Sequence, residues 1–136
     1  MARWTCPRCD REFQRTRQSH ACIPGNSVDA TFRKRPEQRP IYDAIMKHLK
    51  TLGPVHADAV QVGVFLKSDR KVAELRPKTR WLQCSLYLPG AIADPRIDRA
   101  DRYGAKVINK IKLRTAADVD EQFCEWLTDA YDFNTD

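Results

Sequence analysis

Apolar residues recur at intervals of three or four positions in two stretches of this chain. The first stripe follows Pro40 and consists of Ile41, Ile45, Leu49 and Leu52. This spacing places side chains on one face of an α-helix, and proline is favoured in the first helical turn. Gly53-Pro54 follow directly, and this pair is typical of a helix end. The pattern predicts an amphipathic helix that begins near Pro40 and ends at Gly53.

The second stripe lies near the C-terminus and consists of Val119, Phe123, Trp126, Leu127 and Ala130. Thr115 precedes it, with Asp118 three residues further on, which is the spacing of a capping box at a helix N-terminus. Asp120 and Glu121 add negative charge at the positive end of the helix dipole. These signals predict a last helix that begins directly after Thr115.

Apolar and polar residues alternate with a period of two in several further segments. We expect strands over residues 60–66, 72–76, 81–88 and 106–113. Short turn-like connections between the first three favour an antiparallel meander. Residues 91–104 contain interleaved aspartates and arginines without an apolar period, so we expect a solvated loop there.

The strand over residues 81–88 divides its side chains between two faces. One face carries Leu82, Cys84, Leu86 and Leu88, and the other carries Trp81, Gln83, Ser85 and Tyr87. We expect Cys84 in the core. Phe65 and Trp81 are also expected in the core, because large aromatic side chains are usually buried; the alternative is an exposed stacking surface opposite the leucines. In the last strand Val107, Ile111 and Leu113 point inward, and the outward residues form a basic ladder of Lys106, Lys110 and Lys112.

Together these elements predict a two-layer α+β domain over residues 38–136. Its four-stranded antiparallel sheet is packed on one face by the two helices, in the order helix, strands, helix. A linker over residues 25–37 contains turn-forming residues and a short basic run. Within it, Val28 and Phe32 are expected to dock the linker onto the domain. A small finger over residues 1–24 comes first.

Three of the five cysteines lie in this finger. Cys6-Pro7-Arg8-Cys9 is followed by His20-Ala21-Cys22, a C-x2-C-x10-H-x-C pattern. Two thiolates from a tight turn and a His/Cys pair suit tetrahedral zinc. Cys6, Cys9, His20 and Cys22 then fill all four positions and leave none for a catalytic water, so we predict one structural Zn²⁺ in a CCHC-type finger.

The residues around these ligands fit a miniature fold. Trp4 and Phe13 provide the aromatic pair that so small a unit needs beside its metal. We expect one or two helical turns over residues 12–19, ending near His20 because ligands two positions apart share a face only in extended backbone. A disulfide is the alternative for the cysteines, but it requires an oxidising compartment.

The 136 residues suffice for one ordinary domain with a small appendage. No apolar run is long enough to cross a membrane, and the N-terminus lacks the apolar core of a signal peptide. We therefore expect a cytoplasmic protein in which Cys84 and Cys124 are buried thiols. The net charge is +6, and residues 1–40 hold nine Lys/Arg against four Asp/Glu, a net of +5. Arg8, Arg11, Arg15 and Arg17 concentrate this charge in the finger.

Three functional hypotheses follow. In the first, the protein is a non-enzymatic module that binds DNA or RNA, with phosphate contacts from the finger arginines and from the lysine ladder of residues 106–112. In the second, it is an adaptor that binds a protein partner, with little dependence on salt. In the third, Asp69, Glu74 and Arg76 form a metal-dependent nuclease-like site, although no phosphate loop, catalytic triad or second metal cluster accompanies them. The sequence does not define the oligomeric state.

The chain resembles a bacterial family, domain of unknown function 5655, in its small form with an N-terminal zinc finger. The resemblance extends over nearly the whole chain, and its most specific part is the finger followed by Val28-Asp29-Ala30-x-Phe32. The other matching residues are Arg35-Pro36, Tyr42-Asp43-Ala44, Leu52-Gly53-Pro54-Val55, Phe65, Arg80-Trp81, Leu88-Pro89, Leu113, Asp118 and Ala130-Tyr131. The resemblance implies the finger-plus-domain architecture and no particular activity. Family members carry histidines in the strand that here reads Lys106-Val107-Ile108-Asn109-Lys110, so no role based on those histidines applies to this chain.

Overall fold

The computed structural model describes residues 4–8, 11–13, 15–20 and 27–136. The helices are α1 (Val28–Phe32), α2 (Arg39–Leu52) and α3 (Glu121–Phe133), with 3₁₀ helices η1 (Pro36–Gln38) and η2 (Ala116–Asp118). The strands are β1 (Trp4–Thr5), β2 (Glu12–Phe13), β3 (His56–Val60), β4 (Gly63–Lys67), β5 (Lys71–Pro77), β6 (Leu82–Leu88), β7 (Ile97–Tyr103) and β8 (Lys106–Leu113). No helix in the described ranges is long and apolar enough to span a membrane.

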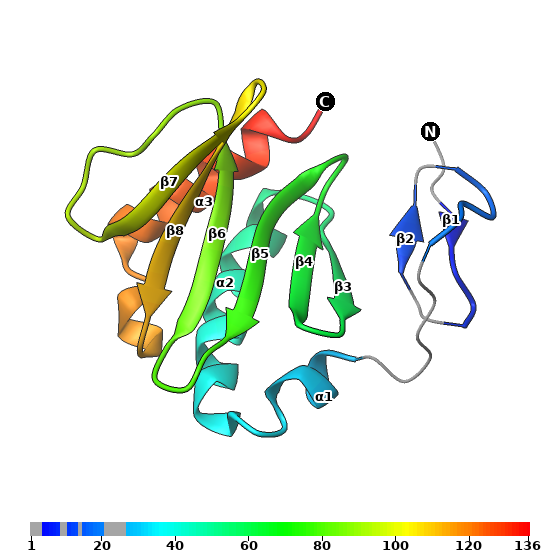
Figure 1. Ribbon diagram of the computed structural model, residues 1–136, viewed down its shortest axis with the longest axis horizontal. Helices are drawn as coiled ribbons and strands as arrows, with labels where there is room; N and C mark the ends of the chain where they lie inside the picture. The colour runs from blue at the N-terminus through cyan, green and yellow to red at the C-terminus, as the bar shows by residue number, and fades with distance from the viewer. Residues whose placement is uncertain (1–3, 9–10, 14, 21–26) are drawn as a thin grey trace.

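The main domain has two layers, as the sequence predicted. Helices α2 and α3 lie side by side on one face of an antiparallel sheet, and among the described residues no helix lies on the other face (Figure 1). The strand order is β3-β4-β5-β6-β8-β7, so the sheet has six strands and the prediction of four is wrong. The two additional strands arise at the two edges of the sheet.

At one edge, the single strand predicted over residues 60–66 is a hairpin. Val60 pairs with Gly63, and the turn between them contains Gln61 and Val62. Val62 is 55% exposed even though it continues the apolar alternation. A Cβ atom on Gly63 would lie 2.1 Å from the carbonyl oxygen of Leu75, so β4 begins beside its neighbour β5 at a position that only glycine fits. His56 is the first residue of β3.

At the other edge, part of the predicted loop over residues 91–104 is strand β7. It pairs with β8 from Arg99 to Tyr103 in regular register, with an irregularity between Ile97 and Arg99. Its charged side chains face solvent, so its pairing depends on backbone hydrogen bonds and produces no apolar period in the sequence. This is why the sequence did not reveal it.

The core lies between the helices and the sheet. Ile41, Ile45 and Leu49 of α2 and Phe123 and Leu127 of α3 are fully buried against the leucines of β6. Cys84 is also fully buried there, which confirms its predicted place, and burial raises the pKa of its thiol. Cys124 on α3 is only half-buried. Phe32 of α1 belongs to this core, as expected for the segment that follows the finger.

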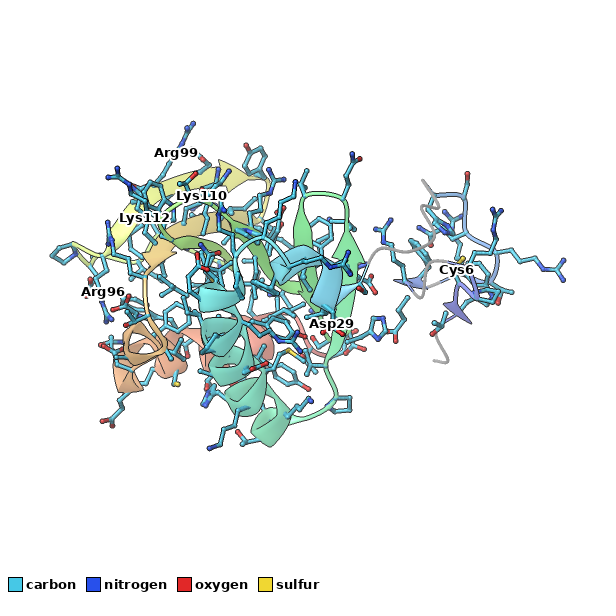
Figure 2. The ribbon with its side chains drawn as sticks, turned by 90° about the horizontal axis from the view of Figure 1, so that it is seen from below. Cys6, Asp29, Arg96, Arg99, Lys110 and Lys112 are labelled. Carbon is cyan, nitrogen blue, oxygen red and sulfur yellow. The ribbon has the colours of Figure 1, made fainter. Side chains whose placement is uncertain are left out.

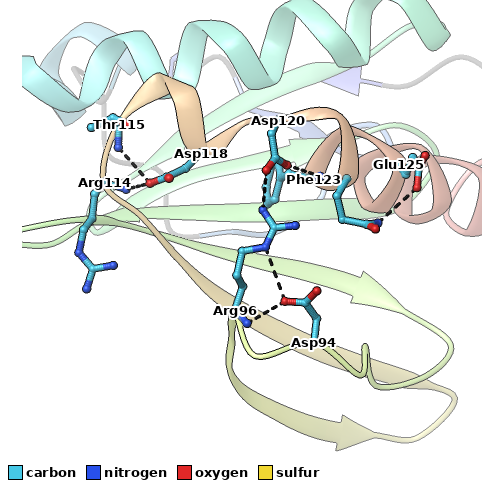
Figure 3. A network of polar contacts seen from close by, with 9 residues as sticks. Asp94, Arg96, Arg114, Thr115, Asp118, Asp120, Phe123 and Glu125 are labelled. Atoms are coloured by element: carbon cyan, nitrogen blue, oxygen red, sulfur yellow. Dashed lines mark hydrogen bonds and ion pairs between the residues drawn. The ribbon is translucent and has the colours of Figure 1, made fainter.

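The last helix begins later than predicted. The capping box of Thr115 and Asp118 is present, but it caps the N-terminus of the short helix η2 and not that of α3. The backbone leaves helical geometry at Val119, and Asp120 then caps α3 by accepting a hydrogen bond from the Phe123 N–H at 2.9 Å (Figure 3). Arg96 donates to the other carboxylate oxygen of Asp120 at 2.9 Å, which joins this helix end to the segment before β7.

The finger contains a two-stranded antiparallel sheet, in which Trp4 pairs with Phe13 and Thr5 with Glu12. The helical turns expected over residues 12–19 are absent from the described residues of that segment. Glu12 and Phe13 are extended, and Arg15 begins a turn in which its carbonyl accepts from the Gln18 N–H at 3.2 Å. Pairing with Trp4 and Thr5 therefore determines the backbone here, rather than local helix propensity.

Candidate functional site

The face of the sheet opposite the helices, which we call the open face, gathers polar and aromatic side chains. The strand register aligns one row across all six strands, and this row consists of Asp58, Phe65, Glu74, Ser85, Lys110 and Arg99. Figure 2 shows Lys110, Lys112 and Arg99 on the side of the sheet away from α2. The open face therefore brings together the predicted binding residues of the domain.

The predicted lysine ladder is present on β8. Lys106, Lys110 and Lys112 are half-buried and alternate with the buried Val107, Asn109, Ile111 and Leu113. Burial lowers the pKa of Lys106. Two acidic residues of β7 contact the ladder: Asp98 lies 3.5 Å from Lys112 and Asp101 lies 4.0 Å from Lys110. Arg114 continues the period of two beyond Lys112 and lies near the same face, a signal that the sequence contained and the prediction missed.

Three aromatic rings on or beside the open face each lie beneath a cation. The Lys71 ammonium is 4.1 Å from the ring centre of Phe65, Lys112 is 4.5 Å from Trp81, and Lys106 is 5.8 Å from Tyr87. All three rings are half-buried. The expectation that Phe65 and Trp81 belong to the core is therefore wrong, because their side chains lie away from the helix layer and no helix in the described part of the chain covers them.

In the finger, the structure describes two of the four predicted zinc ligands, Cys6 and His20. Cys6 is 4% exposed, and its backbone N–H donates to the Arg11 carbonyl at 2.8 Å, which closes the turn after it. Nδ1 of His20 lies 2.6 Å from the Gln18 carbonyl oxygen. The His20 ring packs against Phe13 at 4.2 Å and near Trp4 at 6.0 Å between ring centres.

The other two predicted ligands, Cys9 and Cys22, lie outside the described residues. Within the described ranges no group of three metal-binding side chains comes together. The zinc site therefore stays a prediction. Of the predicted phosphate-binding arginines, Arg8, Arg15 and Arg17 are exposed, and Arg11 is half-buried, 5.1 Å above the ring of Phe13.

The main domain matches a known family model over residues 28–134 of the 136, described as Domain of unknown function (DUF5655). The chain belongs to the DUF5655 family. The match begins at α1 and ends just after α3, so the DUF5655 domain is the two-layer unit, and the finger precedes it. No match was found among curated proteins or among solved structures.

The finger contacts the DUF5655 domain at Asp58 of β3. This carboxylate is fully buried and accepts hydrogen bonds from the Glu12 backbone N–H at 3.0 Å and from Nε2 of His56 at 2.7 Å. Lys67 of β4 lies 2.6 Å from its second oxygen. Burial alone raises the pKa of Asp58, but the hydrogen bonds from His56 and Lys67 outweigh this and hold the pKa below its usual value.

Two of the nuclease-like residues, Glu74 and Arg76, pair with each other, and the third, Asp69, has a separate partner. Asp69, in the turn before β5, accepts a hydrogen bond from the Asp136 backbone N–H at 2.7 Å. Glu74 forms an ion pair with Arg76 on the same strand, and the Tyr87 hydroxyl lies 3.5 Å from its second oxygen. Burial, together with the negative charge of Glu74, raises the pKa of Tyr87 to about 12. Glu74 therefore functions as a partner for Arg76 and Tyr87 on the open face.

Proposed function

We propose that this protein is a zinc-stabilised, non-enzymatic module that binds single-stranded nucleic acid on the open face of its DUF5655 sheet. One observation carries the proposal: Phe65, Tyr87 and Trp81 lie on a helix-free face, each beside a lysine. Aromatic rings on an uncovered sheet accept stacked bases, and neighbouring cations attract the phosphates between them.

The spacing of the rings favours a flexible strand over a stacked duplex. Phe65 stands opposite Glu74, which stands opposite Ser85, and Tyr87 is two residues beyond Ser85 on β6. Strand separation and rise per residue then place the two rings roughly 12 Å apart. Bases stacked on both rings must be separated by far more than the roughly 3.4 Å between neighbours in a duplex strand.

Phosphate contacts come from two sources in this proposal. On the open face, Lys106, Lys110 and Lys112 follow β8 for its whole length beside these rings. In the finger, Arg8, Arg15 and Arg17 are exposed, and Arg11 is half-buried. Contacts of this kind bind without reading the base sequence and weaken steeply with salt, because each neutralised phosphate releases counterions.

Zinc would be held by Cys6, Cys9, His20 and Cys22. Cys6 and His20, the two of these residues that the structure describes, support the assignment. The contact of His20 Nδ1 with the Gln18 carbonyl fits the tautomer that leaves Nε2 as the metal-binding nitrogen, and a carbonyl in this position is a common second partner of a ligating histidine. When bound, the ion supplies structural cross-linking to a unit whose own core consists of Cys6, Phe13 and Trp4.

The test is fluorescence anisotropy of labelled single-stranded and double-stranded DNA and RNA against the full-length, zinc-loaded protein over a salt series. Wild-type protein should prefer single strands. Lys110→Gln/Lys112→Gln should weaken binding at low salt about tenfold or more and reduce the slope of log K against log salt by about 1.4, since each lost phosphate contact contributes about 0.7 for single strands.

The matched control is Lys47→Gln/Lys50→Gln, which removes two exposed lysines from α2 on the opposite side of the sheet. It should bind as wild type does. Absence of binding at low salt, or equal losses in the two double variants, contradicts the proposal. An Arg11/Arg15/Arg17 triple alanine variant separates the finger's contribution from that of the sheet. A protein partner bound with little salt dependence would instead favour the adaptor function.

A further inference from the structure

Strand β7 forms an edge of the sheet that is open to pairing. It is last in the strand order, beyond β8, and within the described part of the chain no strand lies along its outer side, although the loop from β6 to β7 swings out on that side (Figure 1). Its residues are mostly exposed, including Tyr103 at 65%. The opposite edge differs, because β3 contacts α1 and holds the finger through Asp58. An uncovered edge strand presents backbone donors and acceptors to a further strand.

The charges of β7 are complementary to those of a second, antiparallel copy of itself. Its central sequence reads Asp98-Arg99-Ala100-Asp101-Arg102. If two copies pair with Ala100 opposite Ala100, each Arg99 stands opposite the partner's Asp101. A shift of one residue in either direction sets Arg99 opposite Arg102 or Asp98 opposite Asp101. A shift of two sets Arg99 opposite Arg99 or Asp101 opposite Asp101. The centred register alone places opposite charges together throughout.

The side-chain orientations fit this register. Arg99 and Asp101 pair with Lys110 and Ile108 of β8, so both lie on the open face. They already contact each other along the strand, with Arg99 Nε 2.9 Å from a carboxylate oxygen of Asp101. Directly opposed residues of an antiparallel pair share a face and bring their Cβ atoms to about 5 Å. Two copies would therefore assemble an alternating ring of four charges on one face.

We propose that β7 is a homodimerisation edge, at which two copies of this chain pair antiparallel about a two-fold axis at Ala100. This symmetry is the commonest among homo-oligomers, and it joins the two sheets into one with both helix layers on the same side. The proposal rests on β7 alone and does not depend on nucleic-acid binding. Strand pairing along one edge buries less than the roughly 1,200 Å² of stable interfaces, so the dimer forms at high protein concentration.

Sedimentation equilibrium of the full-length protein, free of nucleic acid, tests this up to about 1 mM. Wild-type protein should show a concentration-dependent dimer. Arg99→Asp places aspartates at positions 99 and 101, and Asp101→Arg places arginines at both. The association constant of each variant alone should therefore fall at least tenfold. An equimolar mixture of the two variants should recover a dimer, because every opposed pair is then again of opposite charge. The double variant R99D/D101R should also dimerise.

Arg99 is exposed and Asp101 is half-buried, with neither in the core, and circular dichroism should show each variant folded as wild type is. Three results would overturn the proposal. They are a wild-type protein that stays monomeric over the whole concentration range, single variants that dimerise as wild type does, and a mixture that remains monomeric.

Discussion

The backbone N–H of Glu12 donates a hydrogen bond to Oδ1 of Asp58 at 3.0 Å, across 46 positions of sequence. This bond joins strand β2 of the finger to strand β3 of the DUF5655 domain. Asp58 is fully buried and also contacts His56 and Lys67. One carboxylate thus links the finger to the sheet and holds the β3–β4 hairpin together.

Replacing Asp58 by Asn should lower the free energy of unfolding by about 3 kcal/mol. The substitution keeps the shape but removes the charge that compensates Lys67 in a buried position, and breaking such a pair is costly. Urea denaturation measures the change. The control is Asp43→Asn on α2, which removes an exposed ion pair with Arg39 and should change stability by less than about 1 kcal/mol. Equal effects of the two substitutions would show that the Asp58 contacts contribute no more than a surface pair.

The contribution of the Asp58 charge to the free energy of unfolding should disappear in acid. Its pKa in the folded protein is below the value of about 3.9 expected for the unfolded chain. Its ionisation therefore stabilises the fold fully above that unfolded value, and this stabilisation is lost as the pH falls from about 4 through the folded pKa. The difference in unfolding free energy between wild type and D58N should be largest near neutral pH and smaller at about pH 3. A difference that is the same at both pH values would contradict the assignment.

Cys6→Ser should release the predicted zinc. Wild-type protein should contain one zinc ion per chain by mass spectrometry of metals, and the variant should contain none, because a hydroxyl is a poor replacement for a zinc-bound thiolate. Far-ultraviolet circular dichroism should still report a folded domain, since the main core lies within residues 28–134. Cys124→Ser, at a half-buried thiol on α3, is the control and should retain the metal. Full zinc content in the Cys6 variant would show that the ligand set is wrong.

Gly63→Ala should destabilise the domain by about 3 kcal/mol. The new methyl group would lie 2.1 Å from the carbonyl oxygen of Leu75, and backbone atoms of a central strand cannot move aside cheaply. Gly90→Ala is the control, because a Cβ atom there meets nothing within 4 Å, and its effect should be within about 0.5 kcal/mol. Thermal or urea unfolding compares the two. If both variants unfold alike, the close approach of β4 to β5 is relaxed in solution.

The contacts between the finger and the domain could not be predicted from the sequence. Asp58 stands between two alanines, His56 follows a Pro-Val pair, and nothing local indicates that Lys67 and Glu12 meet them. Phe65 and Trp81 were expected in the core but lie on or beside the open face. Burial statistics describe residue types and do not tell which side of the sheet the helices cover. Their position beside lysines on the open face depends on how the helices pack against the sheet.

By itself the sequence determined several elements whose side chains divide between core and solvent. Helix α2, the faces of β6 and the alternation of lysines with buried residues on β8 follow from periodicity, because each of those strands or helices buries one face and exposes the other. Strands β3 and β7, the short helix α1 and the turn at Val62 depended on tertiary structure. An edge strand is held by backbone hydrogen bonds to its neighbour, and the position of a turn is selected by how closely Gly63 can approach β5. Neither backbone pairing nor close backbone approach produces a pattern in side-chain polarity, so only the folded chain reveals them.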